Sequence, residues 1–555
     1  MPYTIGIDFG TLSGRALLVD THDGREVTTA VLDYPHGAID DVLPTSGKAL
    51  PPEWALQHPL DYLEVIKATV PAVLEQSGVD PSEVVGIGID FTACTMLPVK
   101  ADGTPLMALD EWRDNPHAWV KLWKHHASQP QADTINRVAT ERGETWLERY
   151  GGKYSSEWFF SKALQILEEA PDVYAASDRM LEAADWVIWQ LTGVEARNAC
   201  TAGYKAMVQA GDYPSKDFFA ALHPDFADVV DSKMSREFAQ LGDKAGGLTA
   251  AWAEATGLSE GTAVAVANVD AHVTAPAVKA TQAGVMVMIM GTSTCHIMSD
   301  DTLHDVEGMC GVVAGGIIPG MYGYEAGQSG VGDIFAWFVD NAVPQEYRDA
   351  ADAAGLDIHA YLEQQAAKQR VGEHGLLALD WWNGNRSTLV DTELSGLLVG
   401  MTLATRAPDI YRALIESTAF GTREIIEAFE QKGVQVRELV AAGGLPEKNA
   451  LLRQIYADVT GRPLKLAGSA QAPALGSAMH AAVAAGVYAS IHEAADQMGK
   501  LKDEIVTPIP ENQAVYDVLY GEYKRLYDTF GRGENSVMKT LKRLRQDAVR
   551  AKVTS

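Results

Sequence analysis

A strand, a tight bend and a second strand occur together twice in this chain of 555 residues, at residues 5–20 and 284–298. Both bends carry a Gly-Thr pair, Gly10-Thr11 in the first and Gly291-Thr292 in the second. Small polar residues are common in hairpin turns, so two ordinary turns are one interpretation. The other is a pair of phosphate-binding bends, in which backbone N–H groups hold an anion and Asp8 holds a metal ion nearby.

The order of elements around the two bends is also the same. In the first half, three strands precede a helix at residues 60–78 and an apolar strand at 84–91. In the second half, a helix at 404–433 precedes a strand at 437–444, a helix at 446–461, a strand at 463–468 and a small-residue helix at 474–488. The first helix shows one apolar face, formed by Leu60, Leu63, Ile66, Val70 and Leu74. The chain therefore predicts two copies of one α/β plan, with mixed sheets on either side of a cleft.

Length and composition agree with two large domains in an ordinary globular chain. We place the N-terminal domain at residues 1–280, the C-terminal domain at 281–500 and a helical extension with a basic end at 501–555. The net charge of −29 argues against nucleic acid or an anionic membrane as the main partner. Four scattered cysteines without zinc spacing favour a reducing, cytoplasmic compartment, and we expect neither a signal peptide nor a membrane span.

Several residues have two interpretations from the sequence alone. The segment 84–91 contains two glycines, but they lie within the strand and no third glycine opens a helix, so we discount a dinucleotide-binding loop. Asp270 is either a turn or cap residue or a catalytic residue, and its place just before the second bend favours catalysis. Lys205 is an ordinary solvated lysine or a ligand, and Glu325 follows an apolar strand in a position that suits a cleft.

Paired bends of this kind resemble the fold shared by actin, hexokinase and the heat-shock ATPases. Over nearly the whole chain, the sequence is similar to the FGGY family of carbohydrate kinases. The segments that carry the resemblance are "GIDFGTLSGRALLVD", "NVDAHVTAPAV", "MGTSTC", "AAGGLPEKNALLRQIYADVTGRPL" and "GLLVGMTLATRAPDIYRALIES". The last departs from the family signature only at Leu414, where the family has a smaller or β-branched residue.

This resemblance implies a kinase that binds ATP, Mg²⁺ and a small sugar. Asp270 is expected to act as the general base and Asp8 to hold Mg²⁺. The expected phosphate ligands are Thr11, Ser13 and Arg15 from the first bend and Gly291, Thr292 and Ser293 from the second. Gly443, Gly444 and Asn449 are expected to border adenosine, and Ala93, Lys205, Asp270 and Glu325 to surround the sugar.

Within the family, the segments "YSSEWFFSKALQILEEAPDVY", "GTSTCH", "EAGQS" and "LDWWNGNR" are most similar to the members that phosphorylate L-ribulose. Ala93 and Cys94 stand where glycerol kinases have an Arg-Glu pair, which leaves room for a larger sugar. The expected product is L-ribulose 5-phosphate, as in L-arabinose catabolism, with other 2-ketopentoses as further candidates.

Two alternatives stay open. The nearer is another FGGY kinase acting on D-ribulose, xylulose or a polyol, and the more distant is a chaperone-type ATPase. We also expect the two domains to close on their ligands and the chain to form a homo-oligomer, namely a dimer.

Overall fold

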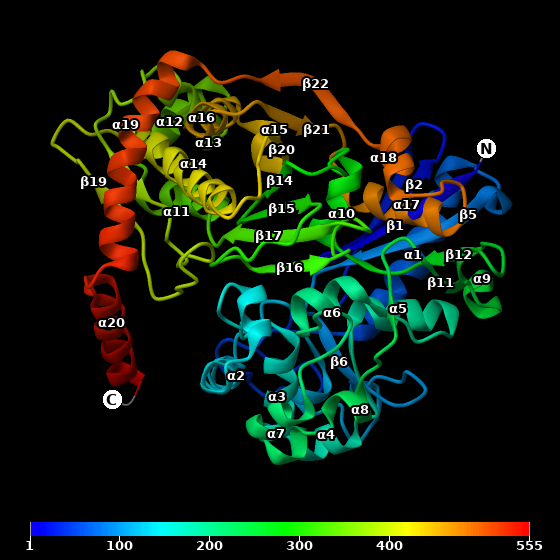
Figure 1. Cartoon of the computed structure of the whole chain (residues 1–555). Helices are drawn as coiled ribbons and strands as arrows, with labels where there is room; N and C mark the ends of the chain where they lie inside the picture. The colour runs from blue at the N-terminus through cyan, green and yellow to red at the C-terminus, as the bar shows by residue number, and fades with distance from the viewer. Residues whose placement is uncertain (1, 554–555) are drawn as a thin grey trace.

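The computed structural model describes residues 2–553, and two mixed β-sheets form its centre (Figure 1). The first sheet has the order β11-β12-β5-β1-β2-β3, with β13 beside the end of β5. Its strands are β1 (Tyr3–Phe9), β2 (Ser13–Asp20), β3 (Arg25–Asp33), β5 (Val84–Phe91), β11 (Lys244–Gly247), β12 (Ala263–Ala265) and β13 (Asn268–Val269). Strands β1 to β3 form an antiparallel meander, whereas β5 runs parallel to β1.

The second sheet repeats this plan in the order β16-β17-β15-β14-β20-β21-β22. Its strands are β14 (Val285–Met290), β15 (Thr294–Asp300), β16 (Gly311–Ala314), β17 (Tyr322–Gln328), β20 (Glu438–Ala442), β21 (Leu464–Ala467) and β22 (Leu501–Val506). Strand β14 pairs antiparallel with β15 and parallel with β20, as β1 pairs with β2 and β5. The predicted fold class, with two similar α/β halves, is confirmed.

Two long helices hold equivalent places in the two halves. Helix α1 (Pro59–Ser77) packs against β2 and β3, and α14 (Ala407–Gln431) lies within the apolar core of the second half. The buried side of α1 includes Ile66, Val70 and Leu74 of the predicted face, but it also takes in Tyr62 and Val65, whereas Leu60 is 39% exposed.

Helix α17 (Ala472–Ala484) crosses from the second half of the chain to the first sheet. It packs on β1 and β5 and also against α10 (Asp270–Ala277). Close approach is possible because both strands carry glycine there: a Cβ on Gly6 would lie 1.8 Å from the Ala474 carbonyl oxygen, and one on Gly88 would lie 1.9 Å from that of Ser477. Sequence position therefore does not by itself assign α17 to a domain.

A smaller lobe is inserted in the first half and lies at the bottom of Figure 1. Its four-stranded sheet has the order β4 (Leu56–Gln57), β7 (Val120–Lys121), β6 (Met96–Val99) and β8 (Arg179–Glu182). The helices around it are α2 (Gln129–Arg142), α3 (Phe159–Glu169), α4 (Pro171–Ala176), α7 (Lys216–Leu222) and α8 (Val229–Lys233). Helix α5 (Ala183–Thr192) and helix α6 (Ala199–Lys205) connect this lobe to the sheets.

The end of the chain differs from the predicted helical extension at 501–555. Residues 501–506 form β22, an edge strand of the second sheet, before helices α19 (Pro510–Tyr527) and α20 (Val537–Val553) begin. Helix α19 buries a row of tyrosines, Tyr516, Tyr520, Tyr523 and Tyr527, in the core of the second half.

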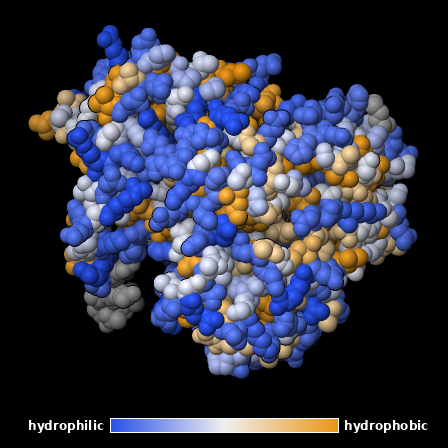
Figure 2. Space-filling view, in the orientation of Figure 1, coloured by the Kyte–Doolittle hydropathy of each residue, from blue (hydrophilic) through white to orange (hydrophobic). Residues whose placement is uncertain are grey.

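Hydrophilic residues cover most of the face in Figure 2, with hydrophobic residues scattered among them. Among the helices that the structure describes, none is both long and apolar enough to cross a bilayer.

Candidate active site

The first bend joins β1 to β2 and places Asp8 beside Arg15. The Gly10 N–H donates to the Ser13 carbonyl oxygen at 3.0 Å and closes the bend. Asp8 and Arg15 face each other across the two strands, with Arg15 Nε 3.3 Å from Asp8 Oδ2. Burial raises the pKa of Asp8, and the Arg15 guanidinium only partly offsets this effect.

Asp90 is a second carboxylate beside the first bend, and the sequence did not single it out. The five residues Ile-Gly-Ile-Asp-Phe occur at 5–9 and again at 87–91, and β1 and β5 pair in parallel so that Asp8 is opposite Asp90. Asp90 is fully buried; its Oδ2 accepts from the Ser477 hydroxyl at 2.6 Å, while its Oδ1 has no hydrogen-bond partner. Burial and the charge of Asp8 raise the pKa of Asp90 well above its ordinary value.

The second bend, residues 291–293, is held by the start of α11 (Gly332–Ala342). The Gly291 N–H donates to the Ser293 carbonyl at 2.9 Å, as in the first bend. The Thr292 carbonyl accepts the N–H groups of Val331 at 2.9 Å and Asp333 at 3.2 Å, while Gly291 and Thr292 are exposed. Each bend is thus closed by a hydrogen bond from a glycine N–H to a serine carbonyl, which lies three residues further on in the first bend and two in the second, and the bends have equivalent places in the two sheets.

Asp270 is the first residue of α10 and follows β13, which pairs with β5 at Asp90. Its Oδ1 accepts the N–H of Ala271 at 2.7 Å, and the N-cap position of the helix is Val269. Burial and the nearby Asp8 raise the pKa of Asp270 to about 7, and Glu325 and Lys205 also influence it, with opposite signs. The carboxylates at the first bend and a second charged group therefore both act on Asp270.

That second group is a buried ion pair between Lys205 at the end of α6 and Glu325 in β17. Lys205 Nζ lies 3.2 Å from both carboxylate oxygens of Glu325, and His272 Nε2 lies 3.0 Å from Oε2. Burial alone would lower the pKa of Lys205 and raise that of Glu325, but the attraction between them reverses both shifts. The pair joins the two halves of the chain, because each half supplies one charge.

Ala93 lies at the turn between β5 and β6, where the backbone is constrained. The next residue, Cys94, has a φ of 64°, in the left-handed region that non-glycine residues seldom adopt. The buried Lys162 ammonium holds this turn by donating to the Cys94 carbonyl at 2.7 Å. Ala93 itself packs against both the core of the inserted lobe and the core between the sheets.

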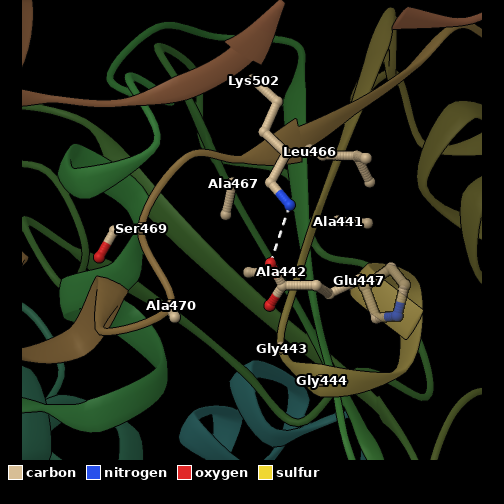
Figure 3. Close-up of a pocket in the computed structure, with 11 residues that line it drawn as sticks. Ala441, Ala442, Gly443, Gly444, Glu447, Leu466, Ala467, Ser469, Ala470 and Lys502 are labelled. Atoms are coloured by element: carbon tan, nitrogen blue, oxygen red, sulfur yellow. Dashed lines mark hydrogen bonds and ion pairs between the residues drawn. The ribbon is translucent and has the colours of Figure 1, made fainter. Parts of the chain in front are cut away.

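A pocket of about 250 Å³ lies at the carboxyl ends of β20 and β21 (Figure 3). Gly443 has a φ of 97°, and a Cβ there would lie 2.4 Å from the Met290 carbonyl, immediately before the second bend. At Gly444, by contrast, a Cβ would meet no atom within 4 Å, so the pocket is open beside it. Glu447 and Lys502 form an ion pair of 2.8 Å at the pocket.

Comparison with known proteins shows the family. Residues 3–276 match the N-terminal domain of the FGGY family of carbohydrate kinases, and residues 286–485 match its C-terminal domain. The chain belongs to this family.

Relatives of this FGGY kinase include proteins named ribulokinase. One from Geobacillus thermodenitrificans is 57% identical over 99% of this chain and 98% of its own length, and one from Mycolicibacterium smegmatis is 56% identical over 99% and 97%. A ribulokinase from Staphylococcus aureus is 38% identical over 98% of this chain and 99% of its own length.

Solved structures of the same fold include xylulose kinase from Rhodospirillum rubrum, with a TM-score of 0.76 and 22% identity over 95% of this chain and 98% of that chain. Glycerol kinase from Plasmodium falciparum with ADP has a TM-score of 0.74 and 14% identity over the same shares. At these identities the likeness shows the fold alone.

The structure brings four of the predicted site residues of the FGGY kinase together. The charges of Asp8, Glu325 and Lys205 all act on Asp270. Asn449 differs: its Oδ1 accepts the Leu452 N–H at 2.7 Å and caps α16 (Ala450–Thr460), so the predicted helix at 446–461 is split after α15 (Gly444–Lys448).

Three further residues were missed at the predicted phosphate and sugar sites. Trp123 Nε1 donates to the Thr11 hydroxyl at 3.0 Å, and Gln57 Nε2 donates to the Thr11 carbonyl at 2.8 Å. Arg386, within one of the segments typical of the family, acts on Glu325 by its charge. Only the duplicated Ile-Gly-Ile-Asp-Phe sequence was a visible signal for the missed Asp90.

Proposed function

We propose that this FGGY kinase is a ribulokinase, which transfers the γ-phosphoryl group of ATP to the terminal hydroxyl of L-ribulose and forms L-ribulose 5-phosphate. The observation that carries the proposal is the 56–57% identity to proteins named ribulokinase over nearly the full length of both chains. Such a reaction is consistent with the arrangement of charges described above.

The sugar would lie near Ala93, Lys205, Asp270 and Glu325. The Lys205–Glu325 pair supports this role because it is buried and offers both an ammonium donor and a carboxylate acceptor to hydroxyl groups. His272 fixes the orientation of Glu325 from the other side. The small side chain of Ala93 at a constrained turn would leave space for a five-carbon ketose.

Asp270 would accept the proton of the attacking hydroxyl. A carboxylate can orient that hydroxyl and take its proton as the bond to phosphorus forms, so a pKa close to neutrality suits the task. The charges of Asp8 and of the Lys205–Glu325 pair both act on Asp270, which supports a place for it between sugar and phosphates.

The phosphates would contact the two bends, through Thr11, Ser13 and Arg15 and through Gly291, Thr292 and Ser293. Asp8 and Asp90 suit a hard cation, because the chain supplies carboxylate oxygens and Asp90 Oδ1 is buried without a partner. Asp8 would hold Mg²⁺, which when bound would neutralise phosphate charge. Charge neutralisation and in-line positioning are the main requirements of phosphoryl transfer.

Adenosine would occupy the pocket in Figure 3, next to Gly443 and Gly444. Backbone at these glycines can approach a ring closely. Asn449 would contribute by fixing the start of α16 beside the pocket and not through a free side chain. Closure of the two halves over both substrates would exclude water from the phosphoryl group.

A coupled assay of ADP release tests the proposal with L-ribulose, D-ribulose, D-xylulose and glycerol as substrates. We expect the highest kcat/KM with L-ribulose and the lowest with glycerol. A preference for xylulose or glycerol would favour another FGGY activity, and ATP hydrolysis that ignores all four compounds would favour the chaperone-type alternative. A cytoplasmic location and a dimer remain predictions, and light scattering on the purified chain would measure the oligomeric state.

A further inference from the structure

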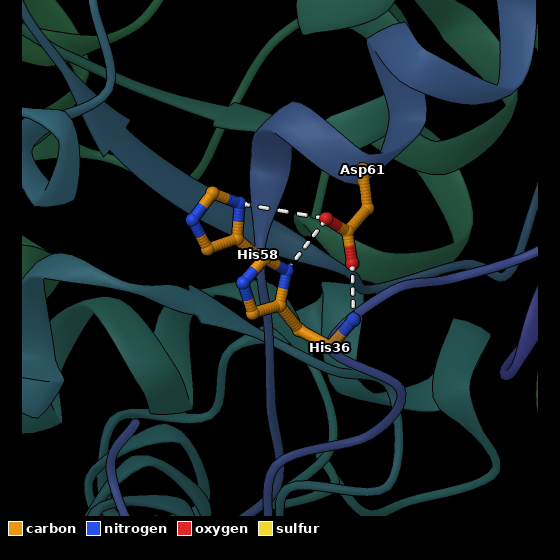
Figure 4. A group of neighbouring side chains, drawn as sticks. All are labelled: His36, His58 and Asp61. Atoms are coloured by element: carbon orange, nitrogen blue, oxygen red, sulfur yellow. Dashed lines mark hydrogen bonds and ion pairs between the residues drawn. The ribbon is translucent and has the colours of Figure 1, made fainter. Parts of the chain in front are cut away.

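Two histidines and an aspartate converge beside the first bend, outside the residues assigned above (Figure 4). His36 lies in the turn after β3, His58 is the N-cap residue of α1, and Asp61 is in the first turn of that helix. Among the side chains that the structure describes, their ligand atoms form a group within 4.8 Å of one another. These three residues are called the His36 cluster.

The geometry of the His36 cluster leaves one nitrogen without a partner. His36 Nδ1 lies 2.8 Å from Asp61 Oδ1, and the His36 backbone N–H donates to Oδ2 at 3.0 Å. His58 Nδ1 points at the same Oδ1 from 3.7 Å, is buried and has no hydrogen-bond partner. The hydrogen bond to Asp61 therefore accounts for the orientation of the His36 imidazole, but no hydrogen bond accounts for that of His58 Nδ1.

The two imidazoles are held in place by packing. Their rings stack with centroids 4.1 Å apart and an interplanar angle of 10°, and Trp119 packs edge-on against His58 at 5.4 Å. The Asp61 side chain is 5% exposed, whereas those of His58 and His36 are 16% and 39% exposed. Packing thus keeps the three side chains of the cluster close together, and the cluster is accessible through His36.

We propose that the His36 cluster binds a divalent transition-metal ion of the Zn²⁺ class through His36 Nδ1, His58 Nδ1 and Asp61 Oδ1. Tetrahedral Zn²⁺ with bonds of about 2.1 Å places neighbouring ligand atoms about 3.4 Å apart. The observed 2.8 Å and 3.7 Å lie on either side of this value. Because the stacked rings hold their nitrogen lone pairs in nearly parallel planes, both rings must also tilt toward each other to complete the site. Two imidazoles favour Zn²⁺ over Mg²⁺ or Ca²⁺, which prefer oxygen ligands, and the fourth position is left for water.

Such an ion would connect the two segments that support the first bend. Tyr34, two residues before His36, donates its hydroxyl to the Gly10 carbonyl at 2.9 Å. Gln57, next to His58, donates to the Thr11 carbonyl at 2.8 Å. We therefore expect binding of the ion to stabilise the folded chain around the first bend.

Calorimetric titration of the metal-stripped full-length chain with Zn²⁺, in excess Mg²⁺, tests the site. The Mg²⁺ competes for oxygen-rich carboxylate sites but poorly for imidazoles. Wild type should bind one more Zn²⁺ than His58→Gln and His36→Gln, or bind it at least ~10-fold more tightly. His492→Gln, which removes an exposed histidine elsewhere, should behave as wild type.

Two further readouts separate binding from folding. Circular dichroism of the metal-free variants should match wild type, and Zn²⁺ should raise the melting temperature of wild type and His492→Gln but not of the two cluster variants. Equal Zn²⁺ stoichiometry and affinity in wild type, His36→Gln and His58→Gln would overturn the proposal, as would no Zn²⁺ binding by wild type. Neither result would bear on ribulokinase activity, which is assayed separately with Mg²⁺.

Discussion

The contact between α17 and the first sheet predicts a large effect of one methyl group. In Gly88→Ala the new Cβ would lie 1.9 Å from the Ser477 carbonyl oxygen and 2.7 Å from its carbon. Real Cβ contacts are rarely below 3.0 Å, so strand and helix must separate by about 1 Å. Both sides of the contact are backbone, and no side-chain rotation can relieve it.

We expect Gly88→Ala to lower the free energy of unfolding by about 3 kcal/mol or more, at the upper end of overpacking effects. Activity should fall as well, because the same shift moves Ser477 away from Asp90. The measurement is the urea midpoint of unfolding followed by tryptophan fluorescence, together with kcat.

Gly521→Ala is the matched control. Gly521 is exposed within α19, and a Cβ there meets no atom within 4 Å. The change should stabilise the chain by ~0.5–1 kcal/mol, because alanine is the better helix former. If Gly88→Ala and Gly521→Ala unfold at the same urea concentration, close backbone packing does not fix α17 on the sheet.

Five further outcomes follow from the site. Asp270→Asn should lower kcat by ~10²–10⁴-fold, with little change in ATP affinity measured by calorimetry. If Asp270 only stabilises the N-terminus of α10, asparagine can replace it and activity stays intact. Because burial raises the pKa of Asp270 to about 7 and the base must be ionised, kcat/KM should fall about tenfold per pH unit below pH 7 in a pH–rate profile. Ala93→Leu should raise the KM for the ketopentose while the KM for ATP stays constant, and unchanged sugar kinetics would remove Ala93 from the pocket. Lys205→Met should lower the free energy of unfolding, measured in urea, by ~3–5 kcal/mol, because Glu325 stays buried without its ammonium partner and keeps only His272. Glu325→Gln in the same chain should recover part of that loss. Small-angle scattering should show compaction with sugar and a non-hydrolysable ATP analogue together, and no change would count against closure.

The fold could be predicted because its signals are local and repeated. Apolar strands around two Gly-Thr bends, followed by helices and strands in the same order, leave few other arrangements. The face of α1 was predicted less well, since a helix in contact with the sheet on one side and α9 (Ala250–Thr256) on another does not bury one simple stripe. Leu60 is exposed although its spacing suits the predicted face.

The missed residues depend on contacts between segments far apart in the sequence. Asp90 joins the site only because β5 pairs with β1 in a register that aligns the two Ile-Gly-Ile-Asp-Phe segments. His36, His58 and Asp61 have no recognised metal-binding spacing, and a turn and a helix start bring them together. Asn449 shows the reverse case: its place before a helix was an N-cap signal that the family resemblance obscured.

The crossing of α17 has a consequence for synthesis of the chain. The ribosome completes the first sheet, which ends at residue 269, long before it reaches residues 472–484. Until then the sheet face around Gly6 and Gly88 lacks its covering helix, with neighbouring apolar side chains such as Leu17 and Val19 open to other chains. N-terminal domains usually fold first as independent units during translation, but this one can bury that face of its sheet only after α17 has been synthesised. A growing or truncated chain that stops before α17 is therefore a natural substrate for chaperones and prone to aggregate.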